Sequence, residues 1–351
     1  MIKEKKSRSN KIKELKSVFF RVIMPNKLQD PYRHKFEKAK YRISNSREYD
    51  QSLKNRGSLT IWFSEEAIGS WNNSTVIKHR KRGRPIIYSD LAIETCITLG
   101  LVYKQRLRQT EGFVESIIKL LQLDLQVPDH TTISRRSGKI EVSKQFKHRD
   151  KALVIAIDST GIKIYGEQEW QEEKYTLKTR KSWRKLHLGI DDEDGSIVSS
   201  ELTSHLTSDS ATIATLLNEI ESPIDTVLAD GAYDQPFTYQ ALRDHQDKHG
   251  NGIVIKAVIP PNLGFRAEMT DDSKLRIDNI RLLEQGRKRW QKHTDYGRRA
   301  KAENAMYRYK TIIGNKLKSR SFLSQKTESK VAINILNIMT KLGRPSTQKI
   351  A

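Results

Sequence analysis

The sequence has little cysteine and no long apolar stretch. Cys96 is the single cysteine among 351 residues, which excludes a disulfide framework and a zinc site built on thiolates. The longest apolar run, residues 91–103, contains Glu94 and is shorter than the roughly 18 residues of a membrane-spanning helix. The N-terminal residues also lack the apolar core of a signal peptide. These absences argue against a secreted or membrane-spanning protein.

Other absences narrow the chemistry. The nine histidines follow no metal-ligand spacing, so a histidine-based zinc site is not indicated. No glycine-rich phosphate loop of the Walker type occurs, so the sequence does not imply ATP binding. No Ser/His/Asp arrangement for nucleophilic catalysis can be recognised either.

Positive charge is abundant and unevenly distributed. The chain has 64 Lys and Arg against 42 Asp and Glu, a formal net charge of +22. Residues 1–88 hold 22 basic and 8 acidic side chains and residues 266–351 hold 21 and 8, whereas residues 151–265 hold 11 and 18. Basic ends suit a polyanion such as DNA, and an acidic centre suits metal ions, although chance clustering gives the same numbers. We expect a cytoplasmic, nucleoid-associated protein with DNA and no membrane as its partner.

The first predicted region, residues 1–88, is a basic N-terminal arm and DNA-contacting region. Its segment at residues 79–85 reads His-Arg-Lys-Arg-Gly-Arg-Pro. Its Arg-Gly-Arg-Pro part can lie along a narrow minor groove of DNA with Arg82 and Arg84 inserted. A basic linker that ends at a proline would have the same composition, so both interpretations stay open.

The second predicted region, residues 89–148, is helical. Gly112 is expected to interrupt its helices, and residues 127–140 begin a further helix that carries Arg135 and Arg136. Short helices followed by a Ser/Thr/Arg-rich helix are typical of a helix-turn-helix that binds DNA. An all-helical packing module fits the same pattern.

The third predicted region, residues 149–345, is α/β. An apolar run that ends at Asp158 is typical of a buried central strand, and a turn is expected at Gly161. The Asp194-Gly195 pair indicates a hairpin, and a second buried strand ends near Asp230. Three antiparallel strands followed by alternating helices and strands predict a mixed sheet.

Asp158 and Asp230 are candidate metal ligands. Each lies at the carboxyl end of a predicted strand, where open α/β sheets gather their ligands. Either residue alone could instead be a helix cap or a turn residue. A buried carboxylate beside a core is costly unless something pairs with it, and a metal ion is one such partner.

Glu303 is the third candidate ligand. It lies on a predicted helix that ends at Gly314, and at about 100° per residue four polar side chains form a stripe roughly 60° wide. These side chains are Tyr296, Arg299, Glu303 and Lys310. An ordinary salt-bridged helix face would also place Arg and Glu four residues apart. Two Asp and one Glu are the hard oxygen ligands that a two-magnesium phosphoryl-transfer site needs.

Three further residues are candidate DNA contacts. Trp183 stands beside cations and could stack on an unpaired base, or pack at the rim of the sheet. Lys318 and Arg320 could contact phosphates or could make a helix end soluble.

The sequence resembles the DDE transposases of bacterial insertion sequences, most closely the IS-five family. Three features carry this resemblance: the segment AIDSTGIKIYG, the segment VLADGAYD and the Tyr-Arg-Glu-Lys spacing. The likeness extends to residues 41–68, 127–137 and 183–191. It implies an RNase H-like, retroviral-integrase-like catalytic domain. It also implies a transposase that binds terminal inverted repeats and target DNA, cleaves strands with an endonuclease step and transfers them.

The same resemblance assigns roles to residues. The catalytic ligands of two Mg²⁺ ions would be Asp158, Asp230 and Glu303, and Mn²⁺ would be able to replace Mg²⁺. Tyr296 and the two signature cations, Arg299 and Lys310, would contact the DNA ends. A homodimer on DNA is expected, because two ends must be cut in concert.

Two other functions are compatible with parts of the sequence. One is a sequence-specific DNA-binding protein without catalysis that uses residues 79–140, and the other is a structure-specific nuclease of similar fold. An intact acidic triad favours an enzyme over a binding protein. Paired terminal repeats in the flanking DNA would favour a transposase over a nuclease.

Overall fold

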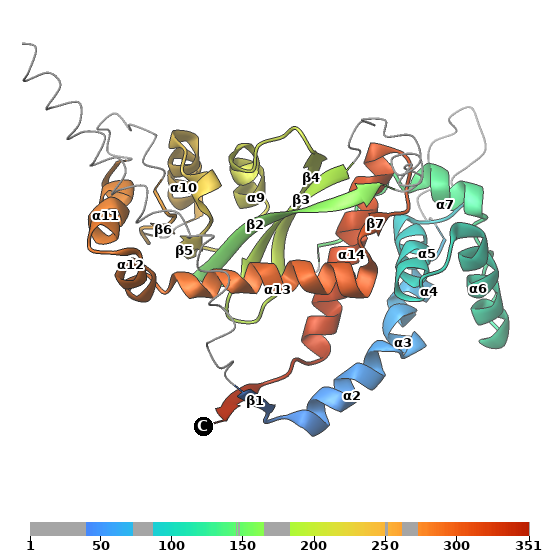
Figure 1. Cartoon of the computed structure of the whole chain (residues 1–351). Helices are drawn as coiled ribbons and strands as arrows, with labels where there is room; N and C mark the ends of the chain where they lie inside the picture. The colour runs from blue at the N-terminus through green and yellow to red at the C-terminus, as the bar shows by residue number, and fades with distance from the viewer. Residues whose placement is uncertain are drawn as a thin grey trace, which may run out of the picture.

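The structure is a computed structural model that describes residues 40–72, 87–144, 146, 148–164, 183–249, 252–261 and 273–350. Helices from the N-terminal half lie on one side of the molecule and a twisted sheet with its helices on the other (Figure 1). The predicted minor-groove segment with Arg82 and Arg84 falls outside the described residues.

The N-terminal half is helical, as expected. Its elements are β1 (Lys40–Ile43), α2 (Ser46–Arg56), α3 (Leu59–Trp62), α4 (Glu65–Gly69), α5 (Asp90–Val102), α6 (Leu107–Leu120) and α7 (His130–Arg136). The Ser89 hydroxyl accepts a hydrogen bond from the Ala92 amide at 3.0 Å and begins α5, and the Asp129 carboxylate begins α7 in the same way.

The expected interruption at Gly112 is wrong, because α6 runs through it. An interior glycine costs about 1 kcal/mol relative to alanine. Packing outweighs that cost here, since Thr110, Val114 and Ile117 on the opposite face of the helix are buried.

The sheet is mixed, as predicted. Among the described residues it has six strands in the order β4-β3-β2-β5-β6, and β7 pairs with the end of β2. The strands are β2 (Leu153–Ile164), β3 (Trp183–Asp191), β4 (Ile197–Ser204), β5 (Ile224–Leu228), β6 (Lys256–Val258) and β7 (Lys316–Leu317). The first three form an antiparallel meander, and β5, β6 and β7 run parallel to β2.

The expected turn at Gly161 is also wrong, because β2 continues straight through it. Gly161 pairs with Lys185, and the Trp183 ring would lie 3.2 Å from a Cβ placed on the glycine. The small residue makes room for the indole and does not turn the chain.

Helices cover both faces of the sheet. They are η3 (Ser210–Thr212), α9 (Ile213–Asn218), η4 (Gly231–Tyr233), α10 (Pro236–His249), α11 (Ser273–Glu284), α12 (Arg287–His293), η5 (Tyr296–Arg299), α13 (Ala300–Arg308), η6 (Tyr309–Ile313) and α14 (Phe322–Leu342). Alternate residues of β2 face opposite sides. Ile155 and Ile157 pack with α9 and α10, whereas Ala156 and Ile162 pack with α13 and α14.

One hydrophobic cluster joins the N-terminal helices to the α13 and α14 side of the sheet. It contains Trp62 and Trp71 from the N-terminal half and Leu188 from β3. Within the described part of the chain, no helix is both long and apolar enough to span a bilayer. The remaining strand, β8 (Thr347–Ile350), follows α14 and pairs with β1.

Candidate active site

Asp230 lies two residues past the end of β5, as expected, whereas the expected strand end at Asp158 is wrong, because β2 continues beyond it to Ile164. Ala156 on β2 is opposite Leu228 on β5, and each aspartate follows its strand partner by two residues. The Asp158 side chain is only 16% exposed. Burial raises the pKa of Asp158, and the negative charge of Asp230 raises it further. The strand register thus brings the two acids to one part of the sheet.

Arg299 connects Asp158 to Glu303. Its Nη1 lies 2.6 Å from Asp158 Oδ2, and its Nη2 lies 2.6 Å from Glu303 Oε1. The Glu303 side chain is 59% exposed, so this acid reaches the site from the solvent side of α13. One guanidinium thus neutralises two of the three candidate ligands.

The helix that carries Arg299 and Glu303 is not a single regular α-helix. Tyr296–Arg299 is a 3₁₀ turn, Ala300–Arg308 is α-helical and Tyr309–Ile313 is a π turn, which contains Lys310. The stripe of four polar side chains expected at 100° per residue therefore describes only the α-helical part of this segment, Ala300–Arg308. The predicted end at Gly314 is confirmed, and its φ of +138° suits glycine.

Tyr296 supports Arg299 from behind. Its ring lies 4.7 Å from the ring of the fully buried Trp290, centroid to centroid, and the Arg299 guanidinium lies 5.8 Å from the Tyr296 ring centre. Burial raises the pKa of the Tyr296 hydroxyl. The phenol is thus half-buried packing for the guanidinium, and any DNA contact would involve its exposed edge.

Asp230 also acts as a turn residue. Its Oδ1 accepts a hydrogen bond from the Ala232 amide at 2.9 Å, which begins η4. Four residues later, the fully buried Asp234 accepts two hydrogen bonds from Arg276 Nε, at 2.9 and 3.1 Å, and one from its Nη2 at 2.9 Å. This ion pair anchors the segment after Asp230 to α11.

Sequence reasoning missed a fourth carboxylate, Asp209, on the other face of β2. Its Oδ1 accepts hydrogen bonds from the Ser159 hydroxyl at 2.8 Å and from Lys185 Nζ at 3.1 Å. His187 Nδ1 lies 3.7 Å away from the same oxygen. The available signal was the alternation of Lys185 and His187 on β3, which points two polar side chains to one face of the sheet.

His187 is a core histidine. It is fully buried, and its Nε2 lies 2.8 Å from the Thr203 hydroxyl. Burial lowers its pKa to about 4, so the ring is neutral at pH 7. It lies opposite Ser159 in the register, next to the strand position of Asp158.

The other predicted DNA contacts are spread over the molecule. Arg136 is tied to Asp90 and to the Tyr88 carbonyl, and Lys318 Nζ donates to the carbonyls of Gly100 and Gln105, each at 3.3 Å. Both cations therefore hold the N-terminal helices in place.

Arg135 and Arg320 are exposed to solvent. Trp183 is half-buried at the start of β3, and its ring centre lies 5.7 Å from that of His205. Trp183 thus packs at the rim of the sheet, which was one of its two expected roles, and part of the residue stays accessible to solvent.

The residues that could hold a metal ion do not form a complete binding site in this structure. Among the described residues, no three His, Cys, Asp or Glu side chains stand close enough together to bind one ion. The donor chemistry of Asp158, Asp230 and Glu303 fits a hard cation. Arg299 stands between two of them, so a cation would have to replace its guanidinium.

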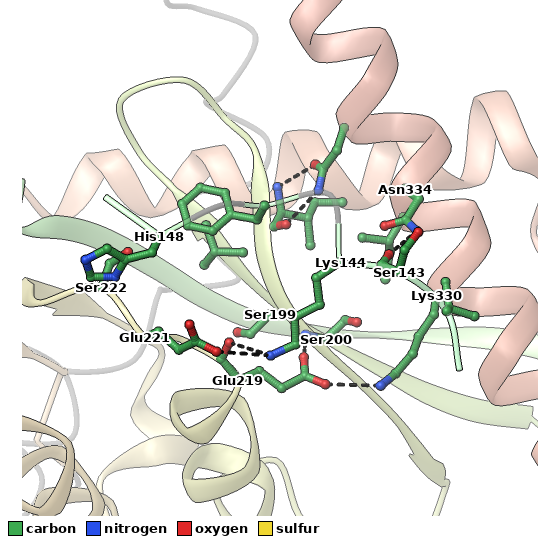
Figure 2. A pocket seen from close by; sticks show the side chains of 16 residues that line it. Ser143, Lys144, His148, Ser199, Ser200, Glu219, Glu221, Ser222, Lys330 and Asn334 are labelled. Carbon is green, nitrogen blue, oxygen red and sulfur yellow. Dashed lines mark hydrogen bonds and ion pairs between the residues drawn. The ribbon is translucent and has the colours of Figure 1, made fainter. Parts of the chain in front are cut away.

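A cavity of about 380 Å³ lies elsewhere, between β4, the end of α9 and α14. Figure 2 shows Lys144 and Lys330 directed at Glu219 and Glu221 in its wall. None of the three candidate ligands lines it. We therefore place the candidate active site where β5 ends beside the middle of β2, and not in this cavity.

Two protein families that match this chain share one description. Residues 149–338 match a family described as transposase DDE domain, and residues 54–167 match a second family of the same description. Among solved structures, the piggyBac transposase synaptic complex with hairpin DNA has 9% identity and a TM-score of 0.36. That alignment covers 83% of this chain and 75% of the other.

Proposed function

The chain belongs to the transposase DDE domain family, whose match spans over half of its length, and we propose that it cleaves and joins DNA at the ends of an insertion sequence. Its targets would be the terminal inverted repeats and a target DNA. Within the family we propose the IS-five group of bacterial elements. The support is the Tyr296, Arg299, Glu303 and Lys310 spacing.

An RNase H-like fold is proposed for residues 149–345. Its support is the strand order, in which an antiparallel meander is followed by two strands parallel to its first strand, with helices on both faces. Asp158, midway along β2, and Asp230, just past the end of β5, then fall at the centre of the sheet. We propose residues 1–88 and 89–148 as the DNA-binding regions that precede it.

The observation that carries the proposal is that β2 and β5 pair so as to bring Asp158 and Asp230 to one part of the sheet, while Arg299 links Asp158 to Glu303. These three acids would hold two Mg²⁺ ions. When bound, such ions activate the attacking water or 3′-hydroxyl and stabilise the leaving oxygen. Mn²⁺, with similar oxygen ligands, would substitute.

Arg299 would then have two roles. Without a cation it offsets the charge of Asp158, which burial would otherwise make costly, and pairs with the exposed Glu303. Once released, its guanidinium would be free to hold a DNA phosphate beside the acids. Lys310 and Tyr296 would contact the DNA end from the same segment, and a homodimer would bring two ends together.

The remaining cations would act farther from the reaction. Arg135, Arg320 and Trp183 have exposed surface and would contact DNA directly. Arg136 and Lys318 would act through the packing they hold. Arg82 and Arg84 would reach a minor groove.

The test is cleavage of DNA that flanks this gene. Purified protein is incubated with end fragments in Mg²⁺ or Ca²⁺, beside Asp158→Ala, Asp230→Ala and Glu303→Ala. We expect cleavage in Mg²⁺ only, and its loss in each variant while DNA binding persists. Asp225→Asn is the matched control, because Asp225 is an exposed acid on the same strand that leads to Asp230.

Two outcomes would contradict the proposal. Wild-type cleavage by any of the three alanine variants would remove that residue from the site. Tight binding to the end fragments without cleavage by the wild-type protein would favour a DNA-binding protein that does no chemistry.

A further inference from the structure

Residues from opposite ends of the described chain form a two-stranded antiparallel ribbon. β1 pairs with β8 over four positions, with Lys40 opposite Ile350 and Arg42 opposite Gln348. All eight residues of the ribbon are exposed. The ribbon therefore adds no side chain to the core, and burial does not explain why the chain forms it.

The base of the ribbon is what stabilises it. Asn45 bridges the two strands, since its Nδ2 donates to the Arg344 carbonyl at 2.9 Å and its Oδ1 accepts from the Ser346 amide at 2.7 Å. Arg56 on α2 donates to the Gly343 carbonyl at 2.9 Å. An isolated two-stranded ribbon is marginally stable in water, so these anchors fix it to α2 and α14.

The chemistry of the ribbon is cationic. It contains Lys40, Arg42 and Lys349 and no acidic residue. The residues that precede it, 1–39, hold twelve Lys and Arg against four Asp and Glu, so the ribbon continues a basic segment. In Figure 1 the ribbon lies below α13, apart from the sheet.

Pairing sorts the side chains into two faces. Paired residues in an antiparallel ribbon point to the same side, and side chains alternate along each strand. One face, which we call the arginine face, carries Lys40, Arg42, Gln348 and Ile350. The opposite face carries Tyr41, Ile43, Thr347 and Lys349.

We propose that the ribbon enters the major groove of duplex DNA with its arginine face toward the bases. The major groove admits a two-stranded ribbon, Arg can bond two guanine atoms and Gln can bond two adenine atoms. Arg42 and Gln348 stand opposite each other and would read neighbouring bases, while Lys40 on the same face would hold a phosphate. Lys349 lies on the opposite face and would point away from the DNA. This assignment rests on the proposed function, because it supplies a DNA contact for that reaction.

Pairing with a second copy of the chain is the competing use of an exposed ribbon. Charges on edge strands oppose such pairing, because two copies would bring like charges side by side. The three cations of the ribbon therefore favour a polyanion over another ribbon.

The experiment measures binding of the full chain to two duplexes, one from the DNA flanking the gene and one of unrelated sequence. The salt dependence of affinity counts phosphate contacts, at about 0.9 in slope for each cation. We expect Lys40→Ala to lower the slope by about 1 on both duplexes, and Lys349→Ala, on the opposite face of the ribbon, to leave it unchanged. The control pair, Lys248→Ala with Lys256→Ala, removes two exposed lysines elsewhere and should leave the slope unchanged.

Gln348→Ala separates base reading from charge. It should keep the salt slope of the wild type and reduce its preference for the flanking duplex by roughly 5- to 150-fold. Arg42→Lys should behave likewise, because it keeps the charge and loses the paired hydrogen bonds. Thermal unfolding of each variant should match the wild type, since the altered side chains are exposed.

Several results would overturn the inference. Unchanged slope and affinity in Lys40→Ala would do so. A ribbon variant that changes the sedimenting mass of the protein without changing its DNA binding would do so as well. If the wild-type protein cleaves the flanking DNA but its ribbon variants bind normally, the ribbon assignment alone fails. If the wild-type protein binds neither duplex, the proposed function fails with it.

Discussion

Gly189 illustrates how closely single residues are fitted in the sheet. It lies on β3 opposite Ser199 on β4, and a Cβ placed on it would stand 2.4 Å from the Ser199 hydroxyl oxygen and 3.5 Å from Ile155. We expect Gly189→Ala to lower the free energy of unfolding by about 1–3 kcal/mol through overpacking. Urea denaturation followed by circular dichroism measures this.

A second substitution isolates the cause. The Ser199 hydroxyl is buried without a hydrogen-bond partner among the described residues, so Ser199→Ala alone should change stability little. Combined with Gly189→Ala it should recover most of the loss, because the closest clash is gone. Gly112→Ala is the control, since nothing lies near that glycine, and should stabilise α6 by up to about 1 kcal/mol. A double variant as unstable as Gly189→Ala would contradict this explanation.

His187 makes stability depend on pH. Its folded-state pKa is about 4, against about 6.5 in an unfolded chain, because burial disfavours its charged form. Between these values the unfolded state binds more protons, so stability is complete above pH 6.5 and falls as the pH drops toward 4. The total loss from this residue is about 3 kcal/mol or less. Asp209 and Lys185 flank the ring and oppose each other's effect on it.

His187→Gln tests this contribution. The variant should lose less stability than the wild type between pH 6.5 and 4, measured by urea denaturation at each pH. Other acids titrate in both proteins, so the difference between the two curves reports the histidine. Parallel curves would mean that His187 has the same pKa in the folded and unfolded states, so that burial does not disfavour its charged form.

At the scale of elements, Asn337 joins α14 to the edge of the sheet. Its Oδ1 accepts from the Ile197 amide and its Nδ2 donates to the Ile197 carbonyl, both at 2.8 Å. The side chain thus acts as a strand neighbour for β4. We expect Asn337→Leu to lower the free energy of unfolding by about 1–3 kcal/mol, because two buried backbone groups lose their partners.

The matched control for this contact is Asn304→Leu, which changes an exposed asparagine on α13. Its free energy of unfolding, measured in urea, should stay within about 0.5 kcal/mol of the wild type. Equal stability of Asn337→Leu and the control would show that water replaces the amide at Ile197.

Elements were predictable from sequence where one local rule dominated. The apolar runs before Asp158 and Asp230 indicated buried strands, and their parallel pairing then aligned the two acids. The Gly161 interpretation failed because glycine also serves close packing, here under Trp183, and that partner is distant in sequence. The contacts of Asp209 with Ser159 and Lys185 could not be predicted for the same reason, since they depend on a loop that folds over β2 and β3.

The regular helix assumed for the signature residues was only partly correct. Spacing alone cannot reveal a 3₁₀ start or a π turn, which tertiary packing selects. The Arg299 contact with Glu303 follows the i, i+4 spacing seen in sequence. Its contact with Asp158 required knowledge of how this segment crosses the sheet, as Figure 1 shows for α13.

At the scale of the molecule, the N-terminal helices and the sheet share one core. The cluster includes Ile93 and Leu99 from α5, Ile335 from α14 and Leu188 from β3. A buried polar link reinforces it, because Asn334 on α14 donates to Glu94 on α5 at 3.2 Å. Burial raises the pKa of Glu94, and its hydrogen bonds from Ser143 and Asn334 partly offset that effect.

This shared core predicts that the N-terminal helices and the sheet unfold together. The two parts have one continuous hydrophobic core where they meet. Separating α5 from it would therefore expose the surface of α14 that also packs on the sheet. Pulsed hydrogen exchange at rising urea, read by mass spectrometry, can follow peptides from α5, β2 and α14 separately. We expect protection in all three to disappear at one urea concentration, whereas the exposed β1 and β8 peptides should exchange from the start. Earlier loss in α5 than in β2 would mean that residues 89–148 form an independent domain, which would let a DNA-binding module detach from an intact catalytic sheet.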